Sequence, residues 1–168
     1  MKEILSTFLS LVSSLYINTV YSPVNFDEKF SVSSTGASIA AGIKVNMTSL
    51  YVIYLELHFN GNDQQDRLRV KALAGSGSMK DGKYIDDGVK IPVNLIIDRV
   101  ENAETTRLLN EDIQNEHLIG FGENSFSKRI KAITLAPGDY NIRISSLKNI
   151  PELDDVDVHL VIQDGGRK

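Results

Sequence analysis

The sequence predicts an all-β protein: an antiparallel Greek-key (Ig-like) β-sandwich of seven or eight strands with one short crossover helix. Apolar and polar residues alternate through much of the chain after residue 23, which is the period of strands with one buried face. Turn residues separate these segments at short intervals, as in two packed antiparallel sheets. The segment Leu135-Ala136-Pro137-Gly138-Asp139-Tyr140 is typical of a tyrosine corner, in which a buried tyrosine donates a hydrogen bond to nearby backbone.

Eight segments carry the strand pattern. In residues 50–59, Tyr51 and every second residue after it form one apolar face. Within residues 129–135, Ile130 and Ile133 share a buried face only if a bulge near Ala132 shifts the register. The other clear strands are expected at residues 91–97, 140–145 and 156–162, and weaker ones at 26–32, 39–45 and 105–113.

One segment departs from the strand period and predicts the helix. Asn62 or Asp63 is a candidate N-cap, Leu68 and Ala72 lie four residues apart, and Gly75 is a natural helix stop. A long loop of residues 76–90 follows. A second irregular stretch, residues 115–127, is too aromatic for a simple linker.

The composition excludes several classes of function. The net charge is −4 and no run of Lys or Arg exceeds two residues, so the chain lacks the clustered cations of a nucleic-acid binder. The absence of cysteine removes disulfides, thiolate nucleophiles and cysteine-type zinc sites. No apolar run is long enough for a stable membrane span. We therefore expect the principal partner to be another protein.

Residues 1–22 are expected to be a signal peptide, and residues 23–168 a single β-sandwich domain. The apolar run at residues 4–16 suits an export signal and is too short to cross a membrane. This predicts a periplasmic or secreted protein. The alternative is that the N-terminus is retained as a strand or helix, which would leave the protein in the cytoplasm.

Several motifs around the corner carry a family resemblance. With the corner, they resemble the domain of unknown function 5625 family of small exported bacterial proteins, over about residues 26–162. The resemblance implies a β-sandwich and an envelope location, and it implies no activity. The chain differs in having no lipobox cysteine for a lipid anchor. The motifs are Leu55-x-Leu57-x-Phe59, Asp66-Arg67-x-Arg69-Val70-x-x-Leu73-x-Gly75, Asp81-Gly82, Gly88-x-x-Ile91-Pro92-Val93-x-Leu95, Asn124-Ser125-Phe126-Ser127-Lys128, Ser146-Leu147 and Ile150-Pro151-Glu152-Leu153.

Metal ligation has limited support. The three histidines, His58, His117 and His159, lack zinc-site spacing, and we interpret His58 with Glu56 as a solvated cross-strand pair. Calcium is the better metal hypothesis because it takes oxygen ligands from flexible loops. Acidic turns are also common because aspartate favours turns, so both interpretations stay open. The candidate calcium ligands are Asp86, Asp87, Asp154, Asp155 and Asp157.

We expect no enzymatic activity, because the chain has neither a Gly-x-Ser-x-Gly nucleophile elbow nor a Gly-x-x-x-x-Gly-Lys phosphate loop. The preferred hypothesis is a non-catalytic exported protein-binding or inhibitory module of the bacterial envelope, with immunity to a secreted toxin as one form. One alternative is a calcium-dependent or small-ligand (glycan or lipid) binding sandwich, and a weak hydrolase is another. The candidate contact residues are Arg67, Arg69, Tyr84, Phe121 and Phe126.

Overall fold

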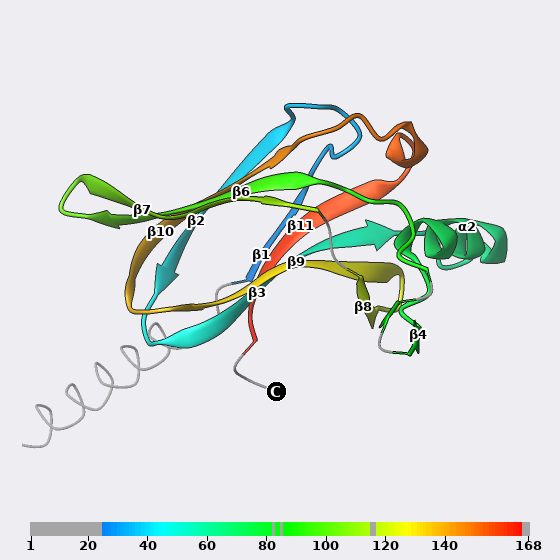
Figure 1. The fold of residues 1–168 in the computed structure, drawn as a ribbon, viewed down its shortest axis with the longest axis horizontal. Coiled ribbons are helices and arrows are strands. Elements are labelled where there is room, and N and C mark those ends of the chain that lie inside the picture. The colour runs from blue at the N-terminus through cyan, green and yellow to red at the C-terminus, as the bar shows by residue number, and fades with distance from the viewer. Residues whose placement is uncertain (1–24, 82, 85, 115–116, 166–168) are drawn as a thin grey trace, which may run out of the picture.

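The computed structural model describes residues 25–81, 83–84, 86–114 and 117–165 (Figure 1). The expected signal peptide lies outside these residues. Two antiparallel sheets pack face to face, which confirms the predicted β-sandwich. Within the described ranges, no helix has the length and hydrophobicity needed to cross a membrane.

One sheet has five strands and the other has four, and a short two-stranded hairpin lies outside both. The five-stranded sheet has the order β1 (Asn25–Lys29), β11 (Asp157–Asp164), β3 (Ser49–His58), β9 (Ser125–Leu135) and β8 (Leu118–Phe121). The four-stranded sheet has the order β2 (Ser38–Val45), β10 (Gly138–Ser146), β6 (Val93–Glu101) and β7 (Glu104–Ile113). The hairpin consists of β4 (Met79–Lys80) and β5 (Lys83–Tyr84).

The alternation of the sequence decides which side chains fill the space between the sheets. Along β3 the residues from Tyr51 to Leu57 in steps of two are buried, while those between them are partly exposed. The facing sheet contributes Ile142 and Ile144 of β10 and Leu95 and Ile97 of β6, all fully buried. The two apolar faces therefore bury each other and leave the outer faces to solvent.

The tyrosine corner forms as the sequence predicts. Tyr140 is buried, and its hydroxyl donates a 2.8 Å hydrogen bond to the carbonyl oxygen of Ala136. The bond joins the start of β10 to the turn after β9. The chain changes sheet repeatedly along its length, which is compatible with the expected Greek-key connections.

The structure also refines three local predictions. The bulge in β9 falls at Ile130, since Ile53 pairs with Lys131 and Tyr54 pairs with Arg129; the expected position near Ala132 was two residues late. The predicted helix exists as α2 (Gln64–Ala74). All eight expected strands occur, and β8 and the β4–β5 hairpin add to them because these short strands carry too few alternating residues to be recognised.

Candidate protein-interaction surface at the helix end

Helix α2, the β4–β5 hairpin and β8 lie together at one end of the sandwich (Figure 1). The helix begins where the sequence indicates, because the Asp63 side chain accepts hydrogen bonds from the backbone N–H groups of Gln65 and Asp66 at 2.8 and 3.2 Å. It ends at Gly75, which has a φ of 97° and donates its N–H to the carbonyl of Lys71. Both caps are therefore local consequences of the sequence.

Two glycines allow the end of α2 to touch the loop that precedes β6. A Cβ atom on Gly75 would lie 2.7 Å from the backbone of Asp87, and one on Gly88 would lie 2.2 Å from the carbonyl oxygen of Leu73. Val89 donates its N–H to the same Leu73 carbonyl at 2.7 Å. Backbone thus packs on backbone here, at a distance that no other residue type permits.

A buried lysine fastens this contact to the sheet. Lys128 of β9 is fully buried, and its ammonium group donates hydrogen bonds to the carbonyl oxygens of Ala74 at 3.1 Å, Asp87 at 2.5 Å and Val89 at 3.1 Å. Its three donors are therefore all used. One acceptor lies at the carboxyl end of α2, where the helix dipole favours a cation. We name Lys128, Gly75 and Gly88 the lysine joint.

Burial lowers the pKa of Lys128 to about 8, against the opposing influence of the carboxylates of Asp87 and Asp86. A lowered pKa is a property of nucleophilic lysines, but this amine has no exposed surface and three backbone partners. Its arrangement supports a structural role, in which it holds the helix and the loop in fixed positions.

A line of aromatic rings runs from α2 to the sheet edge beside the joint. The Arg67 guanidinium lies 5.7 Å from the ring centroid of Phe59, within cation–π range. Phe59 and Phe126 have centroids 5.0 Å apart, and Phe126 meets Phe121 edge-on at 5.8 Å. Phe126 is only 1% exposed, whereas Phe121 is 64% exposed. The buried rings therefore support a phenyl ring that projects into solvent.

Further apolar side chains are exposed at this end. Leu68 of α2, Met79 of β4 and Ile119 of β8 are exposed by 57%, 59% and 43%. With Phe121 they are four of the eight large hydrophobic residues exposed in the described part of the chain. Such a concentration of exposed apolar groups marks interaction sites more often than scattered single residues do. We name Arg67, Leu68, Met79, Ile119 and Phe121 the helix-end surface.

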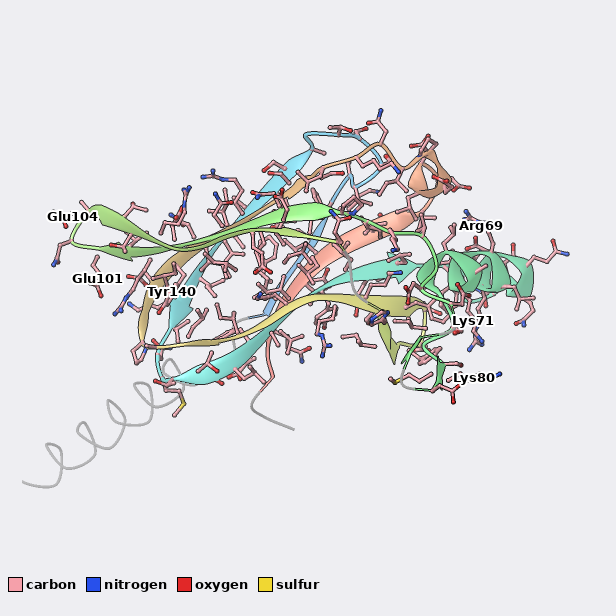
Figure 2. The ribbon with its side chains drawn as sticks, in the orientation of Figure 1. Arg69, Lys71, Lys80, Glu101, Glu104 and Tyr140 are labelled. Carbon is pink, nitrogen blue, oxygen red and sulfur yellow. The ribbon has the colours of Figure 1, made fainter. Side chains whose placement is uncertain are left out.

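The two candidate arginines differ in what they contact. Arg69 donates hydrogen bonds to Asp66 Oδ1 and to Asp155 Oδ1, each at a shortest distance of 2.8 Å, so it ties α2 to the loop after η1 (Pro151–Leu153). The backbone N–H of Asn60 and the Arg69 guanidinium together lower the pKa of Asp66. In Figure 2, Arg69 lies on one side of the helix and Lys71 on the other, toward Lys80 of β4. Arg69 therefore positions the helix, and Arg67 is the more available contact residue.

Phe126 requires a correction. Because it alternates with two serines in β9 and faces the core, its ring cannot form part of the exposed surface that the sequence suggested. Tyr84 lies in β5, but its side chain is not among those that the structure describes.

The acidic loops are used mostly in ion pairs and turns. Asp86 accepts a hydrogen bond from the N–H of Gly88, and Asp87 lies 2.6 Å from His117 Nδ1. Asp157 pairs with Lys29 at 2.7 Å. Among the described residues, no three histidine or acidic side chains form a group able to hold a metal ion.

Asp154 and Asp155 border, with Asp157, a cleft of about 250 Å³ beneath the loop between β1 and β2. Asp154 is exposed, and Asp155 is already engaged by Arg69. The structure brings these three carboxylates to one cleft and places Asp86 and Asp87 in a different loop, beside the lysine joint.

Sequence reasoning missed Lys128 and the exposed side chains of Leu68, Met79 and Ile119. A signal for Lys128 was present: it alternates in phase with Phe126 and Ile130, which places its stem on the buried face.

Several motifs of the resemblance contribute to the contacts at this end, through Arg69, Gly75, Gly88 and Lys128, whereas the corner at Tyr140 lies at the other end of the sandwich (Figure 2). Residues 27–164 match the domain of unknown function 5625 (DUF5625). The chain belongs to the DUF5625 family. No curated protein sequence matches this DUF5625 member.

Among solved structures, this DUF5625 protein is similar to a crystal structure of a protein from Sulfurospirillum deleyianum, with a TM-score of 0.74 and 16% identity. The similarity covers 87% of this chain and all of the other, and it supports the fold alone. A structure of the infectious bursal disease virus Gx strain shares 13% identity over 89% of this chain and 32% of its own, and its TM-score of 0.29 carries no argument.

Proposed function

We propose that this DUF5625 protein is a non-catalytic, exported binding module of the bacterial envelope that recognises another protein through the helix-end surface. Inhibition of a partner, as an immunity protein does, is one form of this role. The observation that carries the proposal is Phe121, a 64% exposed phenyl ring held in place by the buried ring of Phe126. Phenylalanine and the other aromatic residues, methionine and arginine are enriched at the cores of protein interfaces relative to the rest of the surface.

The rigidity of this end supports the same role. The lysine joint fixes the helix to the loop through three hydrogen bonds from one ammonium group, and Arg69 fixes the helix to the loop after η1. A surface that is already ordered loses little conformational freedom when a partner binds. The exposed side chains of α2 are therefore held in position before a partner binds.

Affinity capture from an envelope extract of the native host tests the proposal with matched variants. Phe121→Ser removes the projecting ring. Leu108→Ser is the control, because Leu108 is also an exposed apolar residue, 47% exposed, but lies in β7 of the other sheet. We expect one protein to be retained by the wild type and by Leu108→Ser, and its recovery to fall at least about tenfold with Phe121→Ser, as for loss of an interface hot spot.

The proposal fails if the wild type captures nothing beyond a bare-resin control, or if both variants capture the same protein equally. Circular dichroism of the variants comes first, because only variants with the wild-type β-sheet spectrum report on binding.

A further inference from the structure

The outer face of the five-stranded sheet carries a cluster of charged and titratable side chains that the proposed function does not use. Strand register brings them together: Lys29 pairs with His159 across β1 and β11, and His159 pairs with Glu56 across β11 and β3. We name the set the histidine cluster. Its members are Asp27 and Lys29 of β1, Glu56 and His58 of β3, and Asp157 and His159 of β11.

His159 lies between two carboxylates from different strands. Its Nδ1 is 2.7 Å from Asp27 Oδ1, and its Nε2 is 3.5 Å from Asp157 Oδ2. An ionised carboxylate only accepts hydrogen bonds, so Nδ1 of His159 donates to Asp27. In the neutral ring Nε2 then holds a lone pair directed toward the Asp157 carboxylate. A second proton converts Nε2 into a donor, and the imidazolium is attracted by both carboxylates.

The other charged groups of the cluster are mostly acidic. The cluster contains three carboxylates and one ammonium group, so its net charge is −2 when both imidazoles are neutral. The His58 ring lies 4.5 Å from the His159 ring, and its Nε2 is 3.4 Å from Glu56 Oε2. On the flanking strand β9, the hydroxyl of Ser127 lies 3.5 Å from Glu56 Oε1, and Arg129 is the register partner of Tyr54 in β3.

The charges of the cluster also change the pKa values of two groups. Burial, then the Glu56 and Asp27 carboxylates, raises the pKa of Tyr54. The hydrogen bond from Lys29, assisted by His159, lowers the pKa of Asp157.

These contacts hold an edge strand of the sheet. β1 has five residues, lies at the edge and pairs with β11 alone. Two side-chain contacts join β1 to β11: Asp27 with His159, and Lys29 with Asp157. We propose that the histidine cluster is a proton-dependent clasp, in which protonation of His159 tightens the attachment of edge strand β1 to β11.

The expected pH dependence follows from the groups involved. An imidazolium pairs with carboxylates more strongly than a neutral imidazole does, so the clasp tightens under mildly acidic conditions and loosens under mildly basic ones.

Hydrogen–deuterium exchange of the full chain tests the clasp, with rates corrected for the intrinsic effect of pH. We expect the protection of residues 26–29 to be about two- to fivefold higher at pH 5.5 than at pH 8, the size of effect given by a partly exposed ion pair. His159→Gln should abolish this difference. His117→Gln is the control, because its imidazole pairs with Asp87 far from β1 and the difference should remain.

The clasp is refuted if wild-type β1 has the same protection at both pH values, or if His159→Gln keeps the wild-type difference. A parallel change in β10, a central strand, also refutes it, because the effect would then belong to global stability. Asp27→Asn provides a second variant should His159→Gln fail to fold, and it too should abolish the difference.

Discussion

Replacing Lys128 with methionine removes the ammonium group of the lysine joint and keeps an unbranched side chain of similar length. The substitution leaves the carbonyl oxygens of Ala74, Asp87 and Val89 without their donor. A buried polar group that loses its partner costs about 1–3 kcal/mol, so the three together cost about 6 kcal/mol at mid-range.

A second effect has the opposite sign. The lowering of the Lys128 pKa from 10.5 to about 8 corresponds to a net cost of about 3 kcal/mol for holding the charged amine in its buried site at neutral pH, which methionine does not incur. The net loss of unfolding free energy is therefore about 3 kcal/mol. For a chain of this size that lowers the melting temperature by about 6–12 °C.

Urea denaturation at pH 7, followed by circular dichroism, measures the loss. Lys131→Met is the matched control, because Lys131 lies in the same strand and forms a partly exposed ion pair with Glu111. That pair is worth at most about 1 kcal/mol. If Lys128→Met unfolds at the wild-type urea concentration, or no earlier than Lys131→Met, the structural role of the buried ammonium group is wrong.

Three further predictions concern stability. Between about pH 8 and 10.5 Lys128 keeps its proton in the unfolded chain and has released it in the folded protein, so raising the pH through this window favours folding. In urea titrations the unfolding free energy of the wild type should rise by up to about 3 kcal/mol relative to that of Lys128→Met. A difference between the two proteins that does not change with pH would contradict the lowered pKa. Tyr140→Phe should cost about 1–2 kcal/mol in the same assay because the corner hydrogen bond is lost, and an unchanged melting temperature would disprove the corner's contribution. Gly36→Ala should cost only about 1–2 kcal/mol, for its positive φ, because no atom lies within 4 Å of the added Cβ. Gly88→Ala should cost clearly more, because its Cβ would lie 2.2 Å from the Leu73 carbonyl oxygen. Equal costs for the two variants would contradict the close approach.

Much of the fold could be predicted from sequence because its signals are local. The period of two in β3, the capping residues Asp63 and Gly75 of α2, and the corner at Tyr140 each act over a few residues. The bulge was placed two residues late because alternation shows that a register changes and not which residue is looped out.

The site was harder to predict because its contacts join distant segments. Phe121 was identified as an aromatic residue in an irregular stretch, but the exposure of Leu68, Met79 and Ile119 depends on which strands and helices neighbour them. Lys128 reaches residues 39 to 54 positions away, and no sequence spacing encodes that reach. The histidine cluster likewise depends on β1, β11 and β3 being adjacent.

Site-specific photo-crosslinking in the native host tests the central claim most directly. A photoreactive phenylalanine analogue at position 121 places the reactive group on the helix-end surface, and the same analogue at position 108 places it on exposed β7. The account predicts one discrete heavier product from position 121 and none of that mass from position 108. The absence of a product at position 121, or the same product at both positions, would contradict recognition of a protein partner through the helix-end surface.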